Sequence, residues 1–470
     1  MLPFRRLGQP GSALLLGLLL FVVYNANGRE IGSVDTQPTK FAARALVLTG
    51  SLAVDRDVER QPLFADRVSF VLDQAGHYRS AYSPVEPILG AVVAWVLMNG
   101  AYVDLDAEFS ANLIAVLTAS LLTSGAVVLV FLTVRRIWSA PTAWWVAIGL
   151  GLGTNLWAAA SQTMGQHDAV AFGLAVMVFA WTRDTATLTR SMLWAGAGGL
   201  ALATTARFQT LPLAGVVGLS LLVRVGWRRA AVPLLLIAGS LLALALVQWY
   251  WFGNVLGAAP LLEALHPQIH GVDNSLSRTP WRGAAGLLWS PNRGLLVFSP
   301  IVVLGLAGMR FARSSLADIG GRWLAIAILA QFAAYATYSV WWGGHTYGPR
   351  YLIDLLIPLS IFAAAETDRW LRRASLRRIA ATALAWSIVV AGTGAFYANP
   401  WNSQDDVDEH HERLWDWRDW QISTAWHAGL SSQNFALFHV SGFRPRPVEK
   451  SNPPPTPSKR RRHCCTGSLS

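Results

Sequence analysis

The sequence predicts an all-α integral membrane protein with about eleven transmembrane helices and an outer-face loop that carries surface helices. Its composition is 53% hydrophobic and only 14% charged, whereas a soluble domain carries about a quarter charged residues to cover its surface. The apolar residues also form long blocks that approach or exceed the roughly 20 residues needed to span a bilayer as a helix. The blocks lack period-2 alternation, which favours helices over a transmembrane β-barrel. A soluble globular protein is therefore excluded.

The basic residues follow the same blocks. The formal net charge is +11, and Arg and Lys cluster where apolar runs end, as short cytoplasmic loops do under the positive-inside rule. The clusters are Arg135-Arg136, Arg224/Arg228/Arg229, Arg310/Arg313 and Arg369/Arg372/Arg373/Arg377/Arg378. This placement indicates membrane orientation, so no nucleic-acid partner is expected. The two cysteines, Cys464 and Cys465, are adjacent and predict neither a disulfide framework nor a zinc site.

The first predicted helix is Ala13–Val23, preceded by Arg5-Arg6. A cleavable signal peptide is the alternative, but no small-residue cleavage site follows, so we interpret the segment as the first spanning helix. The N-terminus is then cytoplasmic, and the helix leads into a first outer loop over residues 25–108.

The outer loop is predicted to contain short elements that do not cross the membrane. Pro38 suits the start of a surface helix over Thr39–Thr49, which Gly50 would end. Leu52–Val54 and Val68–Leu72 are predicted to be short strands. Val85–Met98 is too short to cross unaided and has acidic residues after it, so it is predicted to be a second surface helix.

The remaining spans alternate across the membrane and complete the count. They are predicted near 111–134, 140–158, 168–182, 190–206, 208–223, 231–251, 294–309, 322–342, 351–366 and 379–397. Residues 1–397 then form one multi-pass domain, and residues 398–470 form a polar outer tail that is disordered towards its end. We expect a bacterial inner (plasma) membrane location with the C-terminus outside.

On this topology, the ionisable residues away from the cytoplasmic helix ends gather on the outer face. Charge near hydrocarbon is costly and indicates function by default. A site built from several loops at one end of a helical bundle suits a lipid-borne substrate with a polar head. The residues concerned are Arg29, Glu30, Asp35, Lys40, Tyr78, Arg79, Tyr82, Glu86, His167, Asp168, Arg207, Arg293, His345, Arg350 and Asp354.

Five motifs, taken in order, resemble the GT-C glycosyltransferase superfamily, which includes protein O-mannosyltransferases and aminoarabinose transferases. The likeness covers most of residues 10–400. Two features differ from the family pattern: Asp35 is a single acid where many relatives have an acidic pair, and Glu86 and Asp168 stand where small residues are expected. The motifs are Gly32-Ser-Val-Asp-Thr-Gln-Pro38 with Ala42-Ala-Arg-Ala-Leu46, Gly76-His-Tyr-Arg-Ser-Ala-Tyr-Ser-Pro84, Ser161-Gln-Thr-Met-Gly-Gln-His167, Leu288-Trp-Ser-Pro-Asn-Arg-Gly-Leu295 and Trp341-Trp-Gly-Gly-His-Thr-Tyr-Gly-Pro-Arg-Tyr351.

The resemblance implies transfer of a sugar from a polyprenyl-phosphate donor to a glycan, lipid or protein acceptor. It places the catalytic base at Asp35, since an attacking hydroxyl must lose a proton that a carboxylate can take. The helix start after Asp35 favours its anionic form, although Asp35 could simply cap that helix. Arg207, Arg293 and Arg350 could bind the donor phosphate, because guanidinium matches phosphate oxygens in a two-pronged way. Snorkelling towards water is the alternative for each arginine.

Further candidates surround these residues. His167 with Asp168 could be a metal-ligand pair or a proton relay, but a helix-start Asp beside a His is more often structural. Tyr347, with the neighbouring tryptophans, could stack on a sugar ring or belong to an interfacial aromatic belt. Gly343, Gly344, Gly348 and Pro349 predict a shaped turn there. No cofactor follows with certainty, and a divalent metal ion stays an open alternative. The candidates are Lys40, Tyr82, Glu86, His167, Asp168, His345, Tyr347 and Tyr351.

Two other functions stay open. A transporter or flippase would need ionisable residues in broken helices at mid-membrane, whereas the predicted helix centres are almost free of charge. A non-catalytic assembly protein is favoured by the single acid at position 35. Convergence of Asp35, Arg207, Arg293 and Arg350 on one outer cavity would favour the enzyme.

Overall fold

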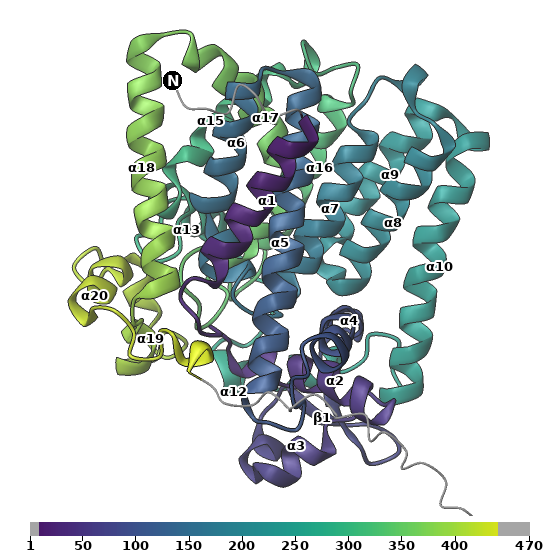
Figure 1. The fold of residues 1–470 in the computed structure, drawn as a ribbon, viewed down its shortest axis with the longest axis vertical. Coiled ribbons are helices and arrows are strands. Elements are labelled where there is room, and N and C mark those ends of the chain that lie inside the picture. The colour runs from purple at the N-terminus through teal and green to yellow at the C-terminus, as the bar shows by residue number, and fades with distance from the viewer. Residues whose placement is uncertain (1–8, 440–470) are drawn as a thin grey trace, which may run out of the picture.

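The computed structural model describes residues 9–439, and this part of the chain is mostly helical. Figure 1 shows a bundle of roughly parallel long helices, with a cluster of short elements at one end. The predicted disorder at the end of the tail falls on residues 440–470 and so lies outside the described residues.

Within residues 9–439, ten long helices form the bundle, and each lies within or close to a range predicted from the apolar blocks. Among the described residues, four stretches are long and apolar enough to cross a membrane: Phe109–Ile137, Phe208–Val225, Trp227–Phe252 and Ala374–Phe396. This is the architecture of a helical membrane protein. The long helices are α1 (Gln9–Asn25), α5 (Phe109–Ile137), α6 (Ala140–Leu152), α7 (His167–Trp181), α8 (Arg190–Ala206), α9 (Leu211–Val225), α10 (Trp227–Phe252), α16 (Gly321–Ala336), α17 (Ile353–Leu371) and α18 (Ala374–Phe396).

Shorter elements connect the long helices or cover their ends. Before α5 they are η2 (Val34–Thr36), α2 (Gln37–Thr49), α3 (Asp55–Arg60), η3 (Pro62–Asp66), β1 (Phe70–Leu72), β2 (Tyr78–Ser80) and α4 (Val85–Gly100). Within the bundle they are η4 (Leu156–Ala160), η5 (Thr185–Thr187), η6 (Phe208–Thr210), α11 (Ala259–Ala264), α12 (His266–His270), α13 (Pro280–Trp289), α14 (Leu295–Phe298), η7 (Pro300–Val302), α15 (Val303–Gly308), η8 (Met309–Arg313) and η9 (Arg350–Leu352). After α18 they are α19 (Trp401–Gln404), η10 (His411–Trp415), α20 (Gln421–Ala428) and η11 (Ala436–Phe438).

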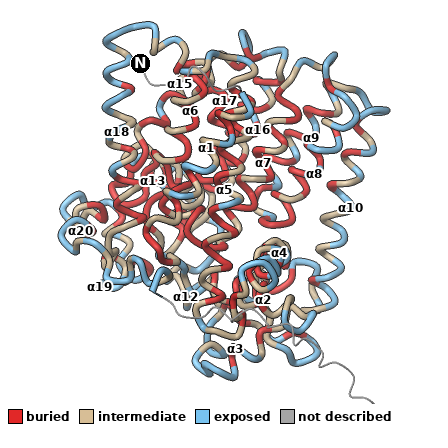
Figure 2. The backbone as a smooth tube through the Cα atoms, viewed as in Figure 1, coloured by how far each residue is buried: buried red, intermediate tan, exposed pale blue. Residues whose placement is uncertain are grey.

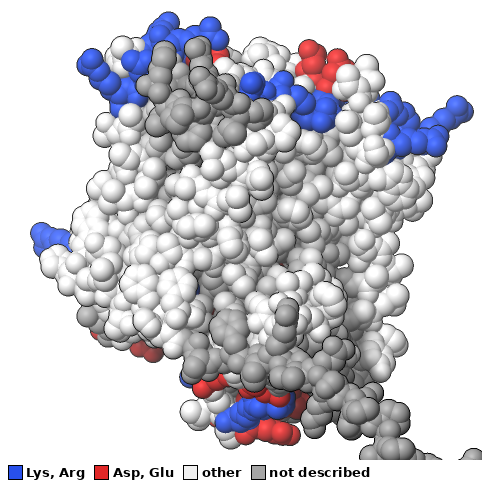
Figure 3. Space-filling model, viewed as in Figure 1, with Lys and Arg blue, Asp and Glu red and all other residues white. Residues whose placement is uncertain are grey.

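Charged side chains separate to the two ends of the bundle. On the face drawn in Figure 3, most Lys and Arg lie at the end where α1 begins, and a mixed acidic and basic group lies at the opposite end. The band between them is almost entirely uncharged. A broad uncharged band flanked by charge is what a bilayer-embedded surface requires.

Burial divides the bundle into a packed interior and apolar outer helices. Figure 2 shows buried segments in the middle of the bundle, while α10 at its edge is largely exposed. Leu235, Leu242 and Leu246 on α10 are each more than half exposed. An exposed apolar helix of this length would be an aggregation liability in water but suits contact with lipid.

The α7–α8 contact depends on two glycines. A Cβ on Gly173 would lie 2.5 Å from the backbone oxygen of Gly199, and a Cβ on Gly199 would lie 2.4 Å from the backbone oxygen of Gly173. The two helix backbones therefore touch directly, as small residues allow in membrane helix pairs.

The outer loop confirms two predicted elements and corrects another. The predicted surface helix is α2, with Pro38 in its first turn and Gly50 ending it in a left-handed conformation. The strand predicted at Leu52–Val54 is wrong: in this described segment only the Val54 N–H reaches the hairpin, donating to Tyr78 O at 2.8 Å. The strand predicted at Val68–Leu72 is confirmed over Phe70–Leu72, and it pairs antiparallel with Tyr78–Ser80, which was not predicted. Residues 73–77 form the turn that joins the two strands into a hairpin.

The predicted second surface helix corresponds to α4, which Figure 1 shows almost end-on, at a steep angle to the long helices. The predicted span at 294–309 is broken into α14, η7 and α15. Pro300 explains the break, because proline lacks an N–H and pushes the residue before it out of the helical region. Ser299 indeed has φ −140° and ψ 65°.

The first part of the tail is folded onto the bundle. Trp401, Leu414 and Ile422 are buried, with at most 1% exposure each. The tail therefore covers the loops that precede α14 and α17, and Trp401 is part of that packing. Trp417, by contrast, is 60% exposed.

Candidate active site

Three segments far apart in the sequence meet at the end of the bundle that carries the outer loop. Asp35 in η2 and Arg350 in η9 approach with their Oδ2 and Nη1 atoms 3.8 Å apart. Both side chains are partly exposed, at 39% and 28%. Tyr82 lies against Asp35, and its partial burial together with the Asp35 carboxylate raises the pKa of its hydroxyl. A carboxylate, a guanidinium and a phenol thus share one accessible site.

The chain before Asp35 is folded tightly, which places the carboxylate. A Cβ on Gly32 would lie 2.1 Å from Glu30 Oε1, so a larger residue there would push the Glu30 carboxylate away from Lys40 and Thr163. The Thr36 hydroxyl accepts from the Ser33 N–H at 3.0 Å and donates to Ser33 O at 3.0 Å. These bonds form a one-turn 3₁₀ helix that leads directly into α2, so Asp35 is held at a helix start as predicted.

Arg350 is positioned by the glycine-rich turn before it. Gly343, Gly344 and Gly348 have φ of +75°, +69° and +69°, which confirms the predicted shaped turn, because such values favour glycine. Tyr347 in this turn does not face the site. Its hydroxyl donates to Val390 O at 3.0 Å and its ring packs edge-on against Phe298.

A fully buried polar network lies beneath the Asp35–Arg350 pair. Asp354 accepts hydrogen bonds from Arg207 and from the Tyr335 hydroxyl, and His167 Nδ1 lies 2.8 Å from its other oxygen. Asp354 is completely buried and Arg207 is 7% exposed. Charges buried this deeply need such partners. Arg207 is therefore neutralised within the protein rather than exposed to a ligand.

Tyr351 connects this network to the accessible site. Its ring stacks on Tyr335 with centroids 5.4 Å apart and planes 14° apart. Arg207 lies over the Tyr351 ring at 5.3 Å and Arg350 at 5.8 Å. A cation–π contact attracts a guanidinium to the face of an aromatic ring. Because the Tyr351 ring is fixed by Tyr335 and Arg207, it helps to hold Arg350 in place.

Arg293 lies apart from Asp35 and is fully enclosed by the protein. Its Nε donates to Trp342 O at 3.0 Å, its Nη1 to Gln421 Oε1 at 3.0 Å and its Nη2 to Gly344 O at 3.0 Å. A guanidinium has only five N–H donors, and these bonds occupy donors on all three nitrogens. Arg293 therefore ties the glycine-rich turn to the tail, and we do not retain it as a phosphate ligand.

Lys40 and Glu30 form a second buried pair beside η2. Lys40 Nζ lies 3.0 Å from Glu30 Oε2 and 2.7 Å from Asn112 Oδ1. The Thr163 hydroxyl donates to the other Glu30 oxygen. Glu30 and Lys40 therefore fasten the outer loop to the bundle, next to the candidate base.

Glu86 and Asp168 are both completely buried. Burial and the adjacent Asp168 carboxyl raise the pKa of Glu86 well above its usual range. Two neighbouring buried carboxyls resist ionising together, which favours the protonated form of Glu86. The pair joins the start of α4 to the start of α7. His167 and Asp168 are thus separate in function: the first binds Asp354 and the second faces Glu86.

The structure adds two residues that the sequence interpretation missed. His345 Nε2 lies 2.6 Å from Asp406 Oδ1 and 3.4 Å from Asp408 Oδ2. The signal was present in the acidic run Asp405-Asp406-Val-Asp408, but it lay in the segment interpreted as a polar tail.

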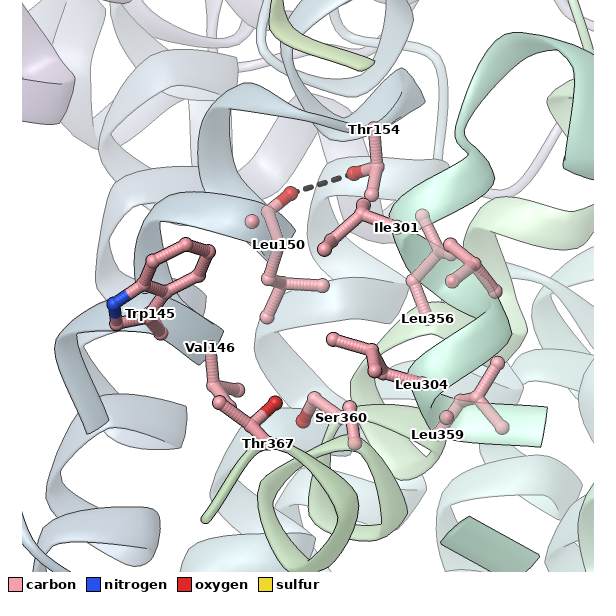
Figure 4. A pocket seen from close by; sticks show the side chains of 14 residues that line it. Trp145, Val146, Leu150, Thr154, Ile301, Leu304, Leu356, Leu359, Ser360 and Thr367 are labelled. Carbon is pink, nitrogen blue, oxygen red and sulfur yellow. Dashed lines mark hydrogen bonds between the residues drawn. The ribbon is translucent and has the colours of Figure 1, made fainter. Parts of the chain in front are cut away.

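An apolar groove runs between α6, α15 and α17, as Figure 4 shows. It is a shallow, half-open groove with a cavity volume of about 40 Å³, lined mostly by hydrocarbon, with Thr154, Ser360 and Thr367 among its polar side chains. The groove follows the length of the helices, from Leu356 near the start of α17 to Thr367 two to three turns later. Its chemistry suits an isoprenoid or acyl chain rather than a sugar.

A comparison with protein-family models found no match, and a comparison with curated proteins found no similar sequence. The fold class, a helical membrane protein, therefore rests on the residues and their geometry alone.

Proposed function

We propose that this protein is a GT-C-type glycosyltransferase that uses a polyprenyl-phosphate sugar at the outer face of a bacterial plasma membrane. The observation that carries the proposal is the approach of Asp35 and Arg350, from segments far apart in the sequence, at a partly exposed site. The two side chains supply complementary chemistry: one can accept a proton and the other can bind a phosphate.

In the proposed reaction, an acceptor hydroxyl attacks the anomeric carbon of the donor sugar. The bond from that carbon to the acceptor oxygen forms while the bond to the phosphate oxygen breaks. Asp35 takes the hydroxyl proton, and Arg350 pairs with the negative charge that develops on the departing polyprenyl phosphate. Tyr82, next to Asp35, orients its carboxylate through the contact between them.

The lipid part of the donor has a matching environment. The apolar groove between α6, α15 and α17 reaches Leu356, which lies within two helical turns of Arg350. A polyprenyl chain in this groove would leave its phosphate at the bundle end where Arg350 lies. This arrangement supports a lipid-linked donor over a soluble nucleotide sugar.

The proposed topology has eleven crossings, with the N-terminus cytoplasmic and the tail outside. The separation of basic residues to the end where α1 begins supports this orientation. The broken segment α14–η7–α15 counts as one crossing, since proteins tolerate irregular backbone at membrane depth where it is buried by other helices. Ile301 and Val302 of that segment are buried.

The test is sugar transfer by purified protein in liposomes that contain polyprenyl-phosphate hexoses and pentoses with isotope-labelled sugars, with bacterial envelope lipids, glycans and proteins supplied as acceptors. Asp35→Asn keeps the size of the side chain but cannot act as a base. Consumption of the donor should fall by roughly two to four orders of magnitude, the range of general base catalysis. Asp66→Asn is the matched control, an exposed acid in the same loop.

Folding of both variants is checked by their thermal unfolding, which should match the parent protein. If Asp35→Asn consumes donor as fast as Asp66→Asn, the assignment of the base is wrong. If the parent protein consumes no donor of either class, the glycosyltransferase proposal itself fails.

A further inference from the structure

Four potential metal ligands meet at the surface formed by α12, the glycine-rich turn and the tail. Ligand atoms of His345, Asp406 and Asp408 all lie within 4.8 Å of one another. His270 lies outside this group of three but contacts one of its members, with its Nδ1 3.3 Å from Asp408 Oδ2. The four residues come from three separate segments, so only the folded chain assembles the cluster.

His270 provides an observation that hydrogen bonding within the cluster does not explain. Its Nδ1 atom is buried and makes no hydrogen bond in the described part of the chain. The contact with Asp408 Oδ2 has the distance of a hydrogen bond but not its alignment. A buried polar nitrogen without a well-aligned hydrogen bond is costly and calls for an explanation such as an ion.

Asp408 is held as a metal-ligating carboxylate usually is. The Trp342 indole donates to Asp408 Oδ1 at 2.8 Å, which leaves Oδ2 directed at the two histidines. The Asp408 side chain is only 8% exposed. An outer-shell donor that fixes one carboxylate oxygen while the other faces the ion is typical of metal sites.

The distances from Asp408 Oδ2 to the two histidine nitrogens fit the coordination of a small tetrahedral ion. Nitrogen and oxygen ligands lie about 2.0–2.1 Å from zinc, so the edges of a regular tetrahedron are about 3.3 Å. The His345–Asp408 and His270–Asp408 contacts are 3.4 Å and 3.3 Å. The His345–Asp406 contact of 2.6 Å is shorter, and it would open as the ion replaced the hydrogen bond.

We propose that His270, His345, Asp406 and Asp408 bind one Zn²⁺ ion. Two imidazoles and two carboxylates are ligands that zinc accepts, and the two carboxylates balance the charge of the ion. Four protein ligands make a closed site, so the ion has a structural role. It fastens α12 and the tail to the turn that leads to Arg350. The inference does not rest on the proposed transferase activity.

The test measures zinc directly. Purified full-length protein in detergent, without a histidine tag, is treated with a chelator, supplied with Zn²⁺, desalted and analysed by elemental mass spectrometry. One zinc per chain is expected, with a rise in the thermal unfolding temperature over the chelated protein. His345→Gln should weaken zinc binding by more than about tenfold, the lower range for perturbing even an outer-shell partner, and should abolish the thermal shift.

His427→Gln is the matched control, because His427 is exposed and lies outside the cluster. It should bind zinc like the parent protein. Without metal, His345→Gln should unfold at the temperature of the chelated parent protein, since the His345 side chain is 47% exposed and removing it disturbs little packing. The proposal is overturned if the parent protein retains no zinc, if His345→Gln retains as much as His427→Gln, or if Mg²⁺ or Ca²⁺ binds in preference to Zn²⁺.

Discussion

Asp35 and Arg350 are each held in position by a different kind of contact. Asp35 depends on a local turn that is held by the two hydrogen bonds between Ser33 and the Thr36 hydroxyl. Arg350 depends on tertiary contacts with Tyr351, which in turn stacks on buried residues. The partly exposed Arg350 is therefore available to a ligand, whereas the buried Arg207 is occupied by contacts within the protein.

Arg350→Lys and Arg207→Lys should separate those roles. Arg350→Lys keeps the charge but loses the two-pronged match to phosphate. A hydrogen bond to a charged group contributes about 1.5–3 kcal/mol, so we expect the KM for the polyprenyl-phosphate donor to rise roughly tenfold or more, with little change in thermal stability. Steady-state kinetics in liposomes and thermal unfolding measure the two effects.

Arg207→Lys should show the reverse pattern. Its guanidinium contacts Asp354 and Tyr335 in a fully buried network, and spoiling a buried ion pair costs about 3–5 kcal/mol when a partner is lost. A clear fall in unfolding temperature is expected. If Arg207→Lys is stable and raises the KM while Arg350→Lys is silent, Arg207 is the phosphate ligand.

At the scale of the elements, the turn of the β1–β2 hairpin is held by one buried side chain, Asp73. Asp73 Oδ1 accepts from the Ala75 and His77 N–H groups at 2.9 Å each, and its Oδ2 accepts from Arg79 Nε at 2.5 Å. Arg79 also covers the Trp251 ring at 4.4 Å, at the end of α10. The hairpin is therefore the link between the outer loop and α10.

The hairpin should loosen in acid. Burial alone would raise the pKa of Asp73, but the hydrogen bonds from His77, Arg79 and Ala75 outweigh it and lower the pKa below its ordinary value of 3.8. A carboxyl with a lowered folded-state pKa stabilises the fold above the unfolded value and loses that contribution as the pH falls through the folded value. Hydrogen exchange at residues 70–80, corrected for the intrinsic rate, should therefore quicken below about pH 4.

Asp73→Asn provides the comparison for that experiment. It should exchange fast at neutral pH already, because the amide cannot supply two acceptor oxygens. Asp66→Asn, elsewhere in the loop, should keep the acid dependence. Equal acid dependence in Asp73→Asn would mean that another group controls the hairpin.

At the scale of the whole molecule, charged side chains are distributed along the long axis of the helical bundle and gather at its two ends. Basic side chains gather where α1 begins, the outer loop covers the opposite end, and an uncharged band lies between (Figure 3). The candidate base, the proposed zinc ligands and the folded tail all belong to the outer-loop end. The proposed chemistry is thus confined to one side of the membrane.

Cysteine labelling should detect that polarity. After Cys464 and Cys465 are replaced by serine, Ala75→Cys in the hairpin turn and Ser375→Cys at the start of α18 introduce single exposed thiols. In intact cells a membrane-impermeant maleimide should label Ala75→Cys only, and permeabilised cells should show both. Labelling of both positions in intact cells, or of Ser375→Cys alone, would contradict the proposed orientation.

The sequence by itself determined the fold class, the surface helix α2 and the turn before Arg350. Each of these depends on local properties: the length of an apolar block, a proline at a helix start, or glycines at positive φ. One prediction failed because Leu52–Val54 has strand-like residues, yet in this described segment only the Val54 N–H bonds to β2, which is too little to form a ladder.

Only the tertiary structure decided how the charged residues pair. Arg207, Arg293 and Arg350 are alike in sequence, yet one is neutralised by Asp354, one is enclosed by the tail, and one reaches Asp35. The cluster of His270, His345, Asp406 and Asp408 is likewise invisible along the chain. Which side chains meet depends on how helices rotate and pack against each other, and apolar periodicity does not specify that rotation for segments far apart in sequence.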